Sequence, residues 1–269
     1  MNPRFALCAL FAIATALPAQ AQGGGLKSPP NQARGIVMQA VDAMGGPRAL
    51  GAVKASVLAI DPQGAPILER HTLRIEGRLM HYASRRKSGA GFDVVVGGGQ
   101  AFLCDRSKQG EATYVEDLTS KDALEGAYER DVLFMPFLLL QLAKKDAKLD
   151  YRGTNSQGHH VIKALVIPDG KAKGERPFTI RLRFHKTTKV LIAAMGVVPL
   201  GQDKGKKRYY EYLDYKPVRF GGHNLLLPHK ISDQRGKDAK AREFNARWKI
   251  NPDLSPSMFV RPQVRKKSN

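Results

Sequence analysis

Alternation of apolar and polar positions is the strongest pattern in the chain. From Phe178 to Phe184 every second residue is apolar, and the residues between them are Thr and Arg. The segment from Phe244 to Ile250 shows the same alternation. A period of two is typical of an antiparallel strand that buries one face. Such segments, separated by turn sequences such as Asn155 to Gly158, fill residues 55–105 and 149–250. They predict about ten antiparallel strands in hairpin order.

Two other segments have the period of a helix. Between Ile36 and Met44 the apolar residues recur at helical spacing, Asn31 can cap the start, and Gly45 to Pro47 ends the pattern. A second helical block, residues 120–145, separates the two strand blocks. The chain is therefore expected to be mainly β, of the α+β class, with an N-terminal helix and a helical insertion at mid-sequence.

The helical insertion contains the longest nearly unbroken apolar run outside the extreme N-terminus, from Asp131 to Ala143. A membrane-spanning helix needs about 20 apolar residues, so this run is too short to cross a bilayer. It must be buried in the protein or lie against a ligand. Strongly twisted sheets of this size curl or close, and small barrels can hold one apolar ligand. The run can therefore act as a lid over a cavity or as a plug that fills one.

The N-terminus reads as a cleaved secretory signal peptide. A short basic start, an apolar core and the small-residue site Ala19-Gln20-Ala21 predict cleavage after residue 21. We expect a flexible leader at 22–30, a single domain at 31–262 and a basic tail at 263–269. The mature chain would keep Cys104 as its one cysteine, so a hydrophobic core rather than a disulfide must stabilise it. The expected location is the periplasm.

The chain is strongly basic, with 44 Lys and Arg against 24 Asp and Glu, a formal net charge of +20. In an exported protein, anionic lipid headgroups or an acidic envelope polymer are better candidates than nucleic acid. A soluble protein of high isoelectric point without a specific anionic ligand is an equally good interpretation, because charges on alternating strand positions form a solvated face. A monomer is expected.

Catalytic and metal-binding patterns are weak. His159 and His160 are adjacent, so on a strand they point to opposite faces and cannot hold one ion together. His71 and His81 lack an evident third ligand, and zinc prefers four ligands at recognisable spacing. No base is evident near Cys104 in the sequence. We therefore expect no enzyme activity, no metal and no cofactor.

Several short motifs resemble those of LolA/LolB-like periplasmic proteins, the relatives of the outer-membrane lipoprotein carriers. They are Leu227-Pro228-His229-Lys230-Ile231, Trp248-Lys249-Ile250-Asn251-Pro252, the Pro136 to Leu139 helix, and Phe184-His185-Lys186-Thr187-Thr188-Lys189. The resemblance implies an incomplete β-barrel whose open concave face is covered by the helices. In the carriers, the apolar cavity accepts acyl chains.

This resemblance and the strand pattern lead to a hypothesis of a non-enzymatic carrier for a lipid or an acylated lipoprotein, with possible docking to an anionic membrane surface. The expected cavity-lining residues are Leu133, Phe134, Phe137, Leu138, Leu140, Phe184, Tyr210, Tyr212, Phe244 and Trp248. Two alternatives stay open: an envelope adaptor whose half-barrel is filled by its own helices, and a module that binds anionic polymers through its basic surface.

Overall fold

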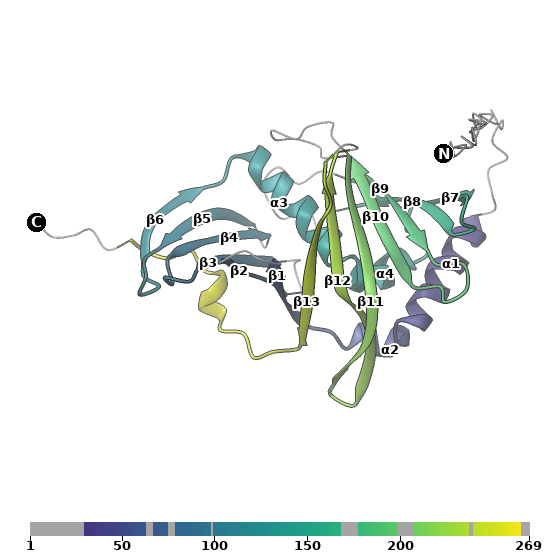
Figure 1. The fold of residues 1–269 in the computed structure, drawn as a ribbon, viewed down its shortest axis with the longest axis horizontal. Coiled ribbons are helices and arrows are strands. Elements are labelled where there is room, and N and C mark those ends of the chain that lie inside the picture. Colours follow the sequence, from purple (N-terminus) through teal and green to yellow (C-terminus); the bar gives the residue numbers. More distant parts are fainter. Residues whose placement is uncertain are drawn as a thin grey trace, which may run out of the picture.

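The computed structural model describes residues 30–62, 67–74, 79–97, 99–167, 177–197, 207–236 and 239–264. The expected signal peptide, the leader up to residue 29 and the tail from residue 265 lie outside the described residues. Within the described ranges, the chain forms one curved antiparallel sheet and a few helices (Figure 1). The predicted mainly β architecture is therefore confirmed.

The sheet contains two meanders of consecutive strands. The first is β1 (Ala55–Pro62), β2 (Ile67–Arg74), β3 (Leu79–Arg86), β4 (Gly91–Gly97), β5 (Gln100–Arg106) and β6 (Ala112–Asp117). The second is β7 (Leu149–Thr154), β8 (His160–Val166), β9 (Phe178–Phe184), β10 (Leu191–Val197), β11 (Lys207–Phe220), β12 (His223–Arg235) and β13 (Arg242–Ile250). We call them the N-terminal and C-terminal halves of the sheet.

The expected number of about ten strands is too low, because the described residues form thirteen. One reason is β6, which no alternation pattern marks. It is an edge strand, and its residues are exposed or only half-buried, so its sequence lacks the apolar face on which the prediction depends.

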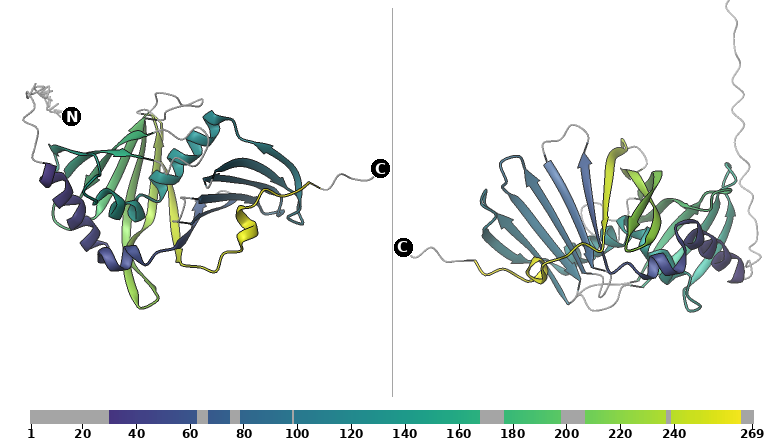
Figure 2. Two further views of the ribbon diagram at one scale, coloured as in Figure 1. Left: turned by 180° about the vertical axis from the view of Figure 1, so that it is seen from behind. Right: turned by 90° about the horizontal axis from the view of Figure 1, so that it is seen from below.

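The two halves join where β1 pairs with β13, from Ser56 opposite Ile250 to Pro62 opposite Phe244. This pairing leaves β6 and β7 at opposite edges of an unclosed sheet. The chain between them forms helix α3 (Ser120–Leu133) and helix α4 (Met135–Leu142), which cross the concave side from one edge to the other (Figures 1 and 2). The helical insertion therefore spans the whole fold.

The N-terminal helix α1 (Pro30–Ala43) packs against α4 and β7, and the short helix α2 (Gly46–Gly51) follows it. The apolar stripe predicted for α1 is buried, with Ile36, Val37 and Met44 among its members. Gly45 has a φ of 123°, and a Cβ there would overlap the Asn224 carbonyl of β12. Only glycine fits this turn, which brings the end of α1 against the long β11–β12 hairpin.

The helical insertion breaks at Phe134 because of Pro136. A proline has no N–H, so Pro136 cannot donate to the carbonyl of Val132 four residues earlier. That carbonyl accepts from a backbone N–H at the end of α3 and from the Tyr212 hydroxyl of β11, the latter at 2.6 Å. The buried Tyr212 therefore adds a second donor beside the break and attaches the break to the sheet.

Helix α4 fills the concave face of the C-terminal half. Phe134 and Phe137 meet the Trp248 ring edge-on, with centroids 6.0 and 5.5 Å apart, and the Trp248 indole N–H donates to the Pro228 carbonyl at 2.6 Å. Leu138 and most of its neighbours in α4 are buried. Here the stretch from Asp131 to Ala143 is a packed core rather than a free lid.

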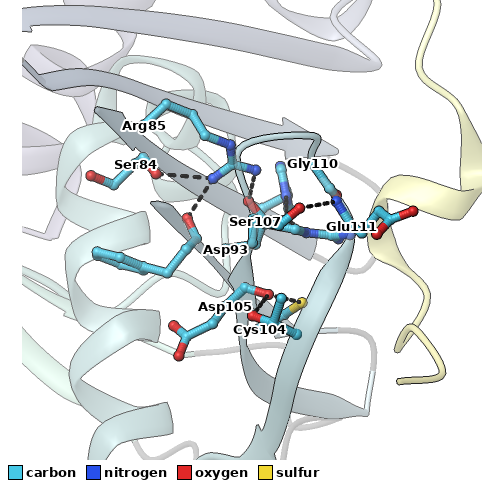
Figure 3. Close-up of polar contacts among 12 residues, drawn as sticks. Ser84, Arg85, Asp93, Cys104, Asp105, Ser107, Gly110 and Glu111 are labelled. Atoms are coloured by element: carbon cyan, nitrogen blue, oxygen red, sulfur yellow. Dashed lines mark hydrogen bonds and ion pairs between the residues drawn. The ribbon is translucent and has the colours of Figure 1, made fainter. Parts of the chain in front are cut away.

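A second, smaller core lies on the opposite face of the N-terminal half. Phe259, from a 3₁₀ turn at Pro256–Phe259, covers apolar side chains that include Val95 and Cys104. Beside this core, Arg85 and Arg106 donate to the buried carboxylate of Asp93 (Figure 3 shows Arg85). Burial raises the pKa of Asp93, but the hydrogen bonds that it accepts outweigh this and hold the pKa well below its ordinary value.

The hydroxyl of Tyr212 can be tested by replacement with Phe. Tyr212→Phe removes a hydrogen bond between two buried groups while the Val132 carbonyl keeps its backbone donor, so the free energy of unfolding should fall by about 1 kcal/mol in urea denaturation. Tyr210 is the matched control, because it lies on the same strand and face, is equally buried, and its hydroxyl has no hydrogen-bond partner among the described residues. Tyr210→Phe removes a buried hydroxyl that has no such partner, so it should leave the free energy of unfolding unchanged or raise it. Equal losses in the two variants would contradict the role given to Tyr212.

Candidate functional site

A cavity of about 420 Å³ lies beneath α3, between the helix and the concave face of the sheet. Its walls come from strands of both halves and from α3. The lining residues are Ile60, His71, Met80, Tyr82, Val94, Leu118, Asp122, Gly126, Glu129, Leu133, Arg208, Tyr210, Asp233, Arg235, Arg242 and Phe244. Where α4 fills its half of the sheet with side chains, α3 leaves this space open.

Two close contacts fix the height of α3 above the sheet. Gly126 faces β4, where an added Cβ would lie 3.0 Å from a methyl group of Val96. Tyr128 lies over Gly196 of β10, where a Cβ would overlap the tyrosine ring and hydroxyl. Small residues at these two points let the helix approach both halves of the sheet closely. Helix α3 therefore lies close to the sheet at both of these points and covers the cavity between them.

One part of the cavity is apolar. Met80 and Val94 lie on neighbouring strands of the N-terminal half, Leu133 comes from the end of α3, and Phe244 comes from β13. Leu133 and Phe244 are also part of the main core. This wall suits an aliphatic chain or an apolar ring, and it offers such a ligand no polar group.

Another part of the lining, the arginine wall, is a cluster of arginines around one buried carboxylate. Arg208 donates from Nε and Nη2 to the two oxygens of Asp233, each at 3.0 Å, and from Nη2 to Glu129 of α3 at 3.0 Å. Arg235 and Arg242 reach the same Asp233 oxygen, each at 3.3 Å. We call these five residues the arginine cluster. It joins β11, β12, β13 and α3 at one end of the strands.

Within the arginine cluster, Arg208 and Asp233 form a buried bidentate ion pair, each side chain being 3% exposed. Burial raises the pKa of Asp233, but the hydrogen bonds and charge of Arg208, with help from Arg235, hold it below the ordinary value. Asp233 is therefore ionised at neutral pH. The side chains of Arg235 and Arg242 are 41% and 60% exposed, so their remaining N–H groups face the cavity mouth and solvent.

His71 stands in the cavity wall as a neutral group. It is buried and stacks on Tyr82 with ring centroids 4.6 Å apart. Burial lowers the pKa of His71 from 6.5 to about 4, and the Arg208 charge acts in the same direction, while Glu129 opposes both. At neutral pH, His71 therefore adds no positive charge to the cavity.

The Tyr210 hydroxyl is an unsatisfied polar group in the cavity lining. Tyr210 is 1% exposed, and its hydroxyl meets no hydrogen-bond partner among the described residues. The guanidinium of Arg208 lies over its ring, 4.9 Å from the centroid. A buried hydroxyl without a partner lowers stability, so a ligand that accepts its hydrogen bond would be stabilised here.

The ten residues predicted to line a cavity fall into two groups. Leu133, Tyr210 and Phe244 do line the cavity beneath α3. The other seven pack elsewhere in or against the main core, and Leu138 also borders a pocket of about 190 Å³ at the far end of α4. Those seven are Phe134, Phe137, Leu138, Leu140, Phe184, Tyr212 and Trp248.

The arginine cluster is not among the residues predicted from the sequence, although one signal in the sequence points to it. Arg208 shares strand parity with Tyr210 and Tyr212, and Asp233 shares it with Ile231, so both charges occupy inward positions. A charged residue on the buried face of a strand needs a partner and marks a site worth examining. Arg235 lies two residues after Asp233 on the same strand, whereas Arg208 and Arg242 come from the neighbouring strands β11 and β13, so their approach depends on the order of strands in the sheet.

The histidines and the cysteine considered for metal binding or catalysis are not brought together in one site among the described residues. In the ranges that the structure describes, no three His, Cys, Asp or Glu side chains are grouped so that they could hold a metal ion. His71 and His81 lie on adjacent strands at positions of opposite parity, so one faces the cavity and the other faces the Asp93 carboxylate. Burial raises the pKa of the Cys104 thiol. No helix among the described residues is long and apolar enough to cross a membrane.

Comparisons with known proteins give a loose structural likeness and no match in sequence. No protein-family profile matches the chain, and no curated protein matches it. Among solved structures, the chain is similar to the Mycobacterium tuberculosis lipoprotein LppX, with 11% identity and a TM-score of 0.29 over 84% of this chain and 99% of that one. A likeness at this level supports no conclusion about ligand or mechanism. Membership of the LolA/LolB-like proteins stays a prediction.

The buried His71 predicts a specific pH dependence. The unfolded chain takes up the His71 proton near pH 6.5 and the folded chain near pH 4, so between these values the unfolded state binds more protons. The free energy of unfolding should therefore fall as the pH drops through this window, by up to about 3 kcal/mol. Urea denaturation of wild type and His71→Phe at pH 7, 6, 5 and 4 measures the difference.

In His71→Phe, the loss of stability between pH 7 and pH 4 should be smaller by this amount, because Phe keeps the stacking on Tyr82 and cannot be protonated. His223→Gln, a half-buried histidine on β12, is the control and should follow the wild-type profile. Parallel profiles for wild type and His71→Phe would contradict a neutral, buried His71.

Proposed function

We propose that the protein is a non-enzymatic binding protein of the cell envelope. In this proposal, the cavity beneath α3 holds one amphipathic, anionic molecule. Examples are a fatty acid, or a lipid that inserts one of its acyl chains. The observation that supports this most strongly is the division of the cavity into an apolar wall and an arginine wall. An aliphatic chain suits the first wall, and a carboxylate or phosphate head suits the second.

The size of the cavity supports a small-molecule ligand. Its volume of about 420 Å³ falls in the range of about 300–1,000 Å³ that is usual for small-molecule sites. Each buried CH₂ of a chain would contribute about 0.8 kcal/mol, so chain length sets affinity while the apolar wall gives little discrimination between chains. Specificity would come from the polar head.

The charges of the arginine cluster support an anionic head. Asp233 and Glu129 already compensate Arg208, which is fully engaged with them. Arg235 and Arg242 are tied to Asp233 by single, longer contacts of 3.3 Å and are partly exposed. Their guanidinium groups can turn toward a carboxylate or phosphate without leaving Arg208 unpaired. The Tyr210 hydroxyl would donate a further hydrogen bond.

The envelope location rests on the signal-peptide pattern of residues 1–21. The residues that bear charge in the cavity are used in ion pairs and stacking, which favours binding over catalysis. The LolA/LolB-like motifs agree with a lipid or acylated lipoprotein as ligand. Transfer of the ligand to a partner would follow from that resemblance and remains part of the proposal.

The binding experiment uses the mature chain and a cavity-filling variant. Native mass spectrometry of purified protein should show a co-purified lipid, and a fluorescent fatty acid should bind and be displaced by unlabelled fatty acid. Val94→Trp places a large ring in the apolar part of the cavity, so binding should weaken at least tenfold. Leu213→Trp is the control, because Leu213 lies on β11, is 36% exposed and does not line the cavity.

Leu213→Trp should bind as wild type does, and circular dichroism should show that both variants fold. Equal affinity of Val94→Trp and wild type would place the ligand elsewhere. Absence of both co-purified lipid and fatty-acid binding in the wild type would end the proposal.

One observation favours a second function. Helix α4 fills most of the concave face of the C-terminal half, with Phe134 and Phe137 packed on Trp248. A fold that is largely filled by its own helices would suit an envelope adaptor that acts through its surface. That function predicts normal folding, no bound lipid, and no effect of Val94→Trp on partner binding.

A further inference from the structure

A second group of cations lies on the outer face of the C-terminal half, away from the cavity. Lys163, Arg181 and Lys207 border a shallow hollow of about 290 Å³ on β8, β9, β10 and β11. Lys163 pairs with Arg181 across β8 and β9, and Lys207 pairs with Val197 across β10 and β11. The other residues that line the hollow are Thr179, Met195, Gly196 and Val197.

The hollow carries positive charge that the described part of the chain does not neutralise. None of its lining residues is acidic, and no ion pair joins these three cations to a carboxylate within the described ranges. Other surface cations differ: Lys216 pairs with Asp214 at 2.7 Å, and Lys230 pairs with Glu243. This hollow therefore attracts anions more strongly than an ordinary solvated strand face does.

Two exposed aliphatic side chains stand at the same end of the strands. Val197, at the end of β10, is 50% exposed, and Ile167, directly after β8, is 53% exposed. β8 and β10 are both neighbours of β9, and Ile180 pairs with Ala164 on one side and Gly196 on the other. This register brings Ile167 and Val197 to one end of the sheet, beside the cations.

We propose that this end of the sheet is a docking surface for an anionic bilayer. Lys163, Arg181 and Lys207 contact lipid phosphates, and Ile167 and Val197 enter the interface between headgroups and acyl chains. Aliphatic side chains next to cations suit a bilayer. A nucleic-acid strand instead favours aromatic side chains on which its bases stack, and none lines this hollow.

The docking surface and the arginine cluster meet on β11. Lys207 points to the outer face, while Arg208, the next residue, points to the concave face and bonds Asp233. Docking through the outer face would therefore bring the polar wall of the cavity close to the membrane surface. The docking itself goes beyond the proposed ligand and does not depend on it.

The experiment is sedimentation of the mature chain with vesicles. Wild type should bind vesicles that contain phosphatidylglycerol and should not bind vesicles of phosphatidylcholine alone. Each cation removed should weaken binding about fivefold, so the triple variant Lys163→Gln, Arg181→Gln, Lys207→Gln should bind about a hundredfold more weakly. The double variant Ile167→Ser, Val197→Ser should weaken the part of vesicle binding that remains at high salt, because salt screens the cations but not the aliphatic side chains.

The matched control removes the same charge elsewhere. Lys216→Gln, Arg219→Gln, Lys249→Gln changes three exposed cations outside the hollow and should alter vesicle affinity less than threefold. The cavity variant Val94→Trp should bind vesicles normally, which separates docking from ligand binding. If both triple variants weakened vesicle binding equally, only the net charge of the protein would matter, and the proposed docking surface would be wrong. Binding of wild type to heparin but not to anionic vesicles would also overturn it, in favour of an acidic polymer.

Discussion

The hydrogen bond from Tyr212 to the Val132 carbonyl attaches the helical insertion to the sheet at the point where α3 ends and α4 begins. Pro136 has no N–H for the regular helical hydrogen bond to that carbonyl, which accepts instead from a backbone N–H at the end of α3 and from Tyr212. The bond from β11 attaches the break at Phe134 to the sheet, and the two helices on either side of it take different positions. Within this one insertion, α4 packs against the C-terminal half of the sheet, and α3 covers the cavity that lies partly over the N-terminal half.

Because the two helices differ in their side chains, one part of the concave face is covered by packed side chains and another part retains a cavity. α4 brings large apolar side chains to the sheet, whereas α3 brings Gly126 and the polar side chain of Glu129. Close contacts at Val96 and Gly196 hold α3 at a fixed height, so the space beneath it does not collapse. The buried Arg208–Asp233 pair joins β11 and β12 and, through Glu129, α3. It also holds Arg235 and Arg242 at the mouth of the cavity through their contacts with Asp233.

Alternation in the sequence was enough to predict a curved antiparallel sheet, because half-buried strands show their inward face directly. It could not reveal β6, whose residues are exposed or half-buried. Nor could it separate the three predicted residues that line the cavity from the seven in the core. Leu133 and Phe134 are equally apolar and adjacent, and only the break at Pro136 and the contacts of Trp248 send them to different environments. The arginine cluster depends on strand order, which local pattern does not encode.

The pairing of β1 with β13 has a consequence for how the molecule is assembled. Residues 56 and 250 are direct neighbours, and Phe259 covers a core built from β3, β4 and β5. The N-terminal meander therefore keeps an open edge and a bare apolar face until nearly the last residues of the domain arrive. Contacts this distant in sequence make folding slow, and an open strand edge invites mispairing. The early strands therefore stay exposed to mispairing until β13 and the segment around Phe259 are in place.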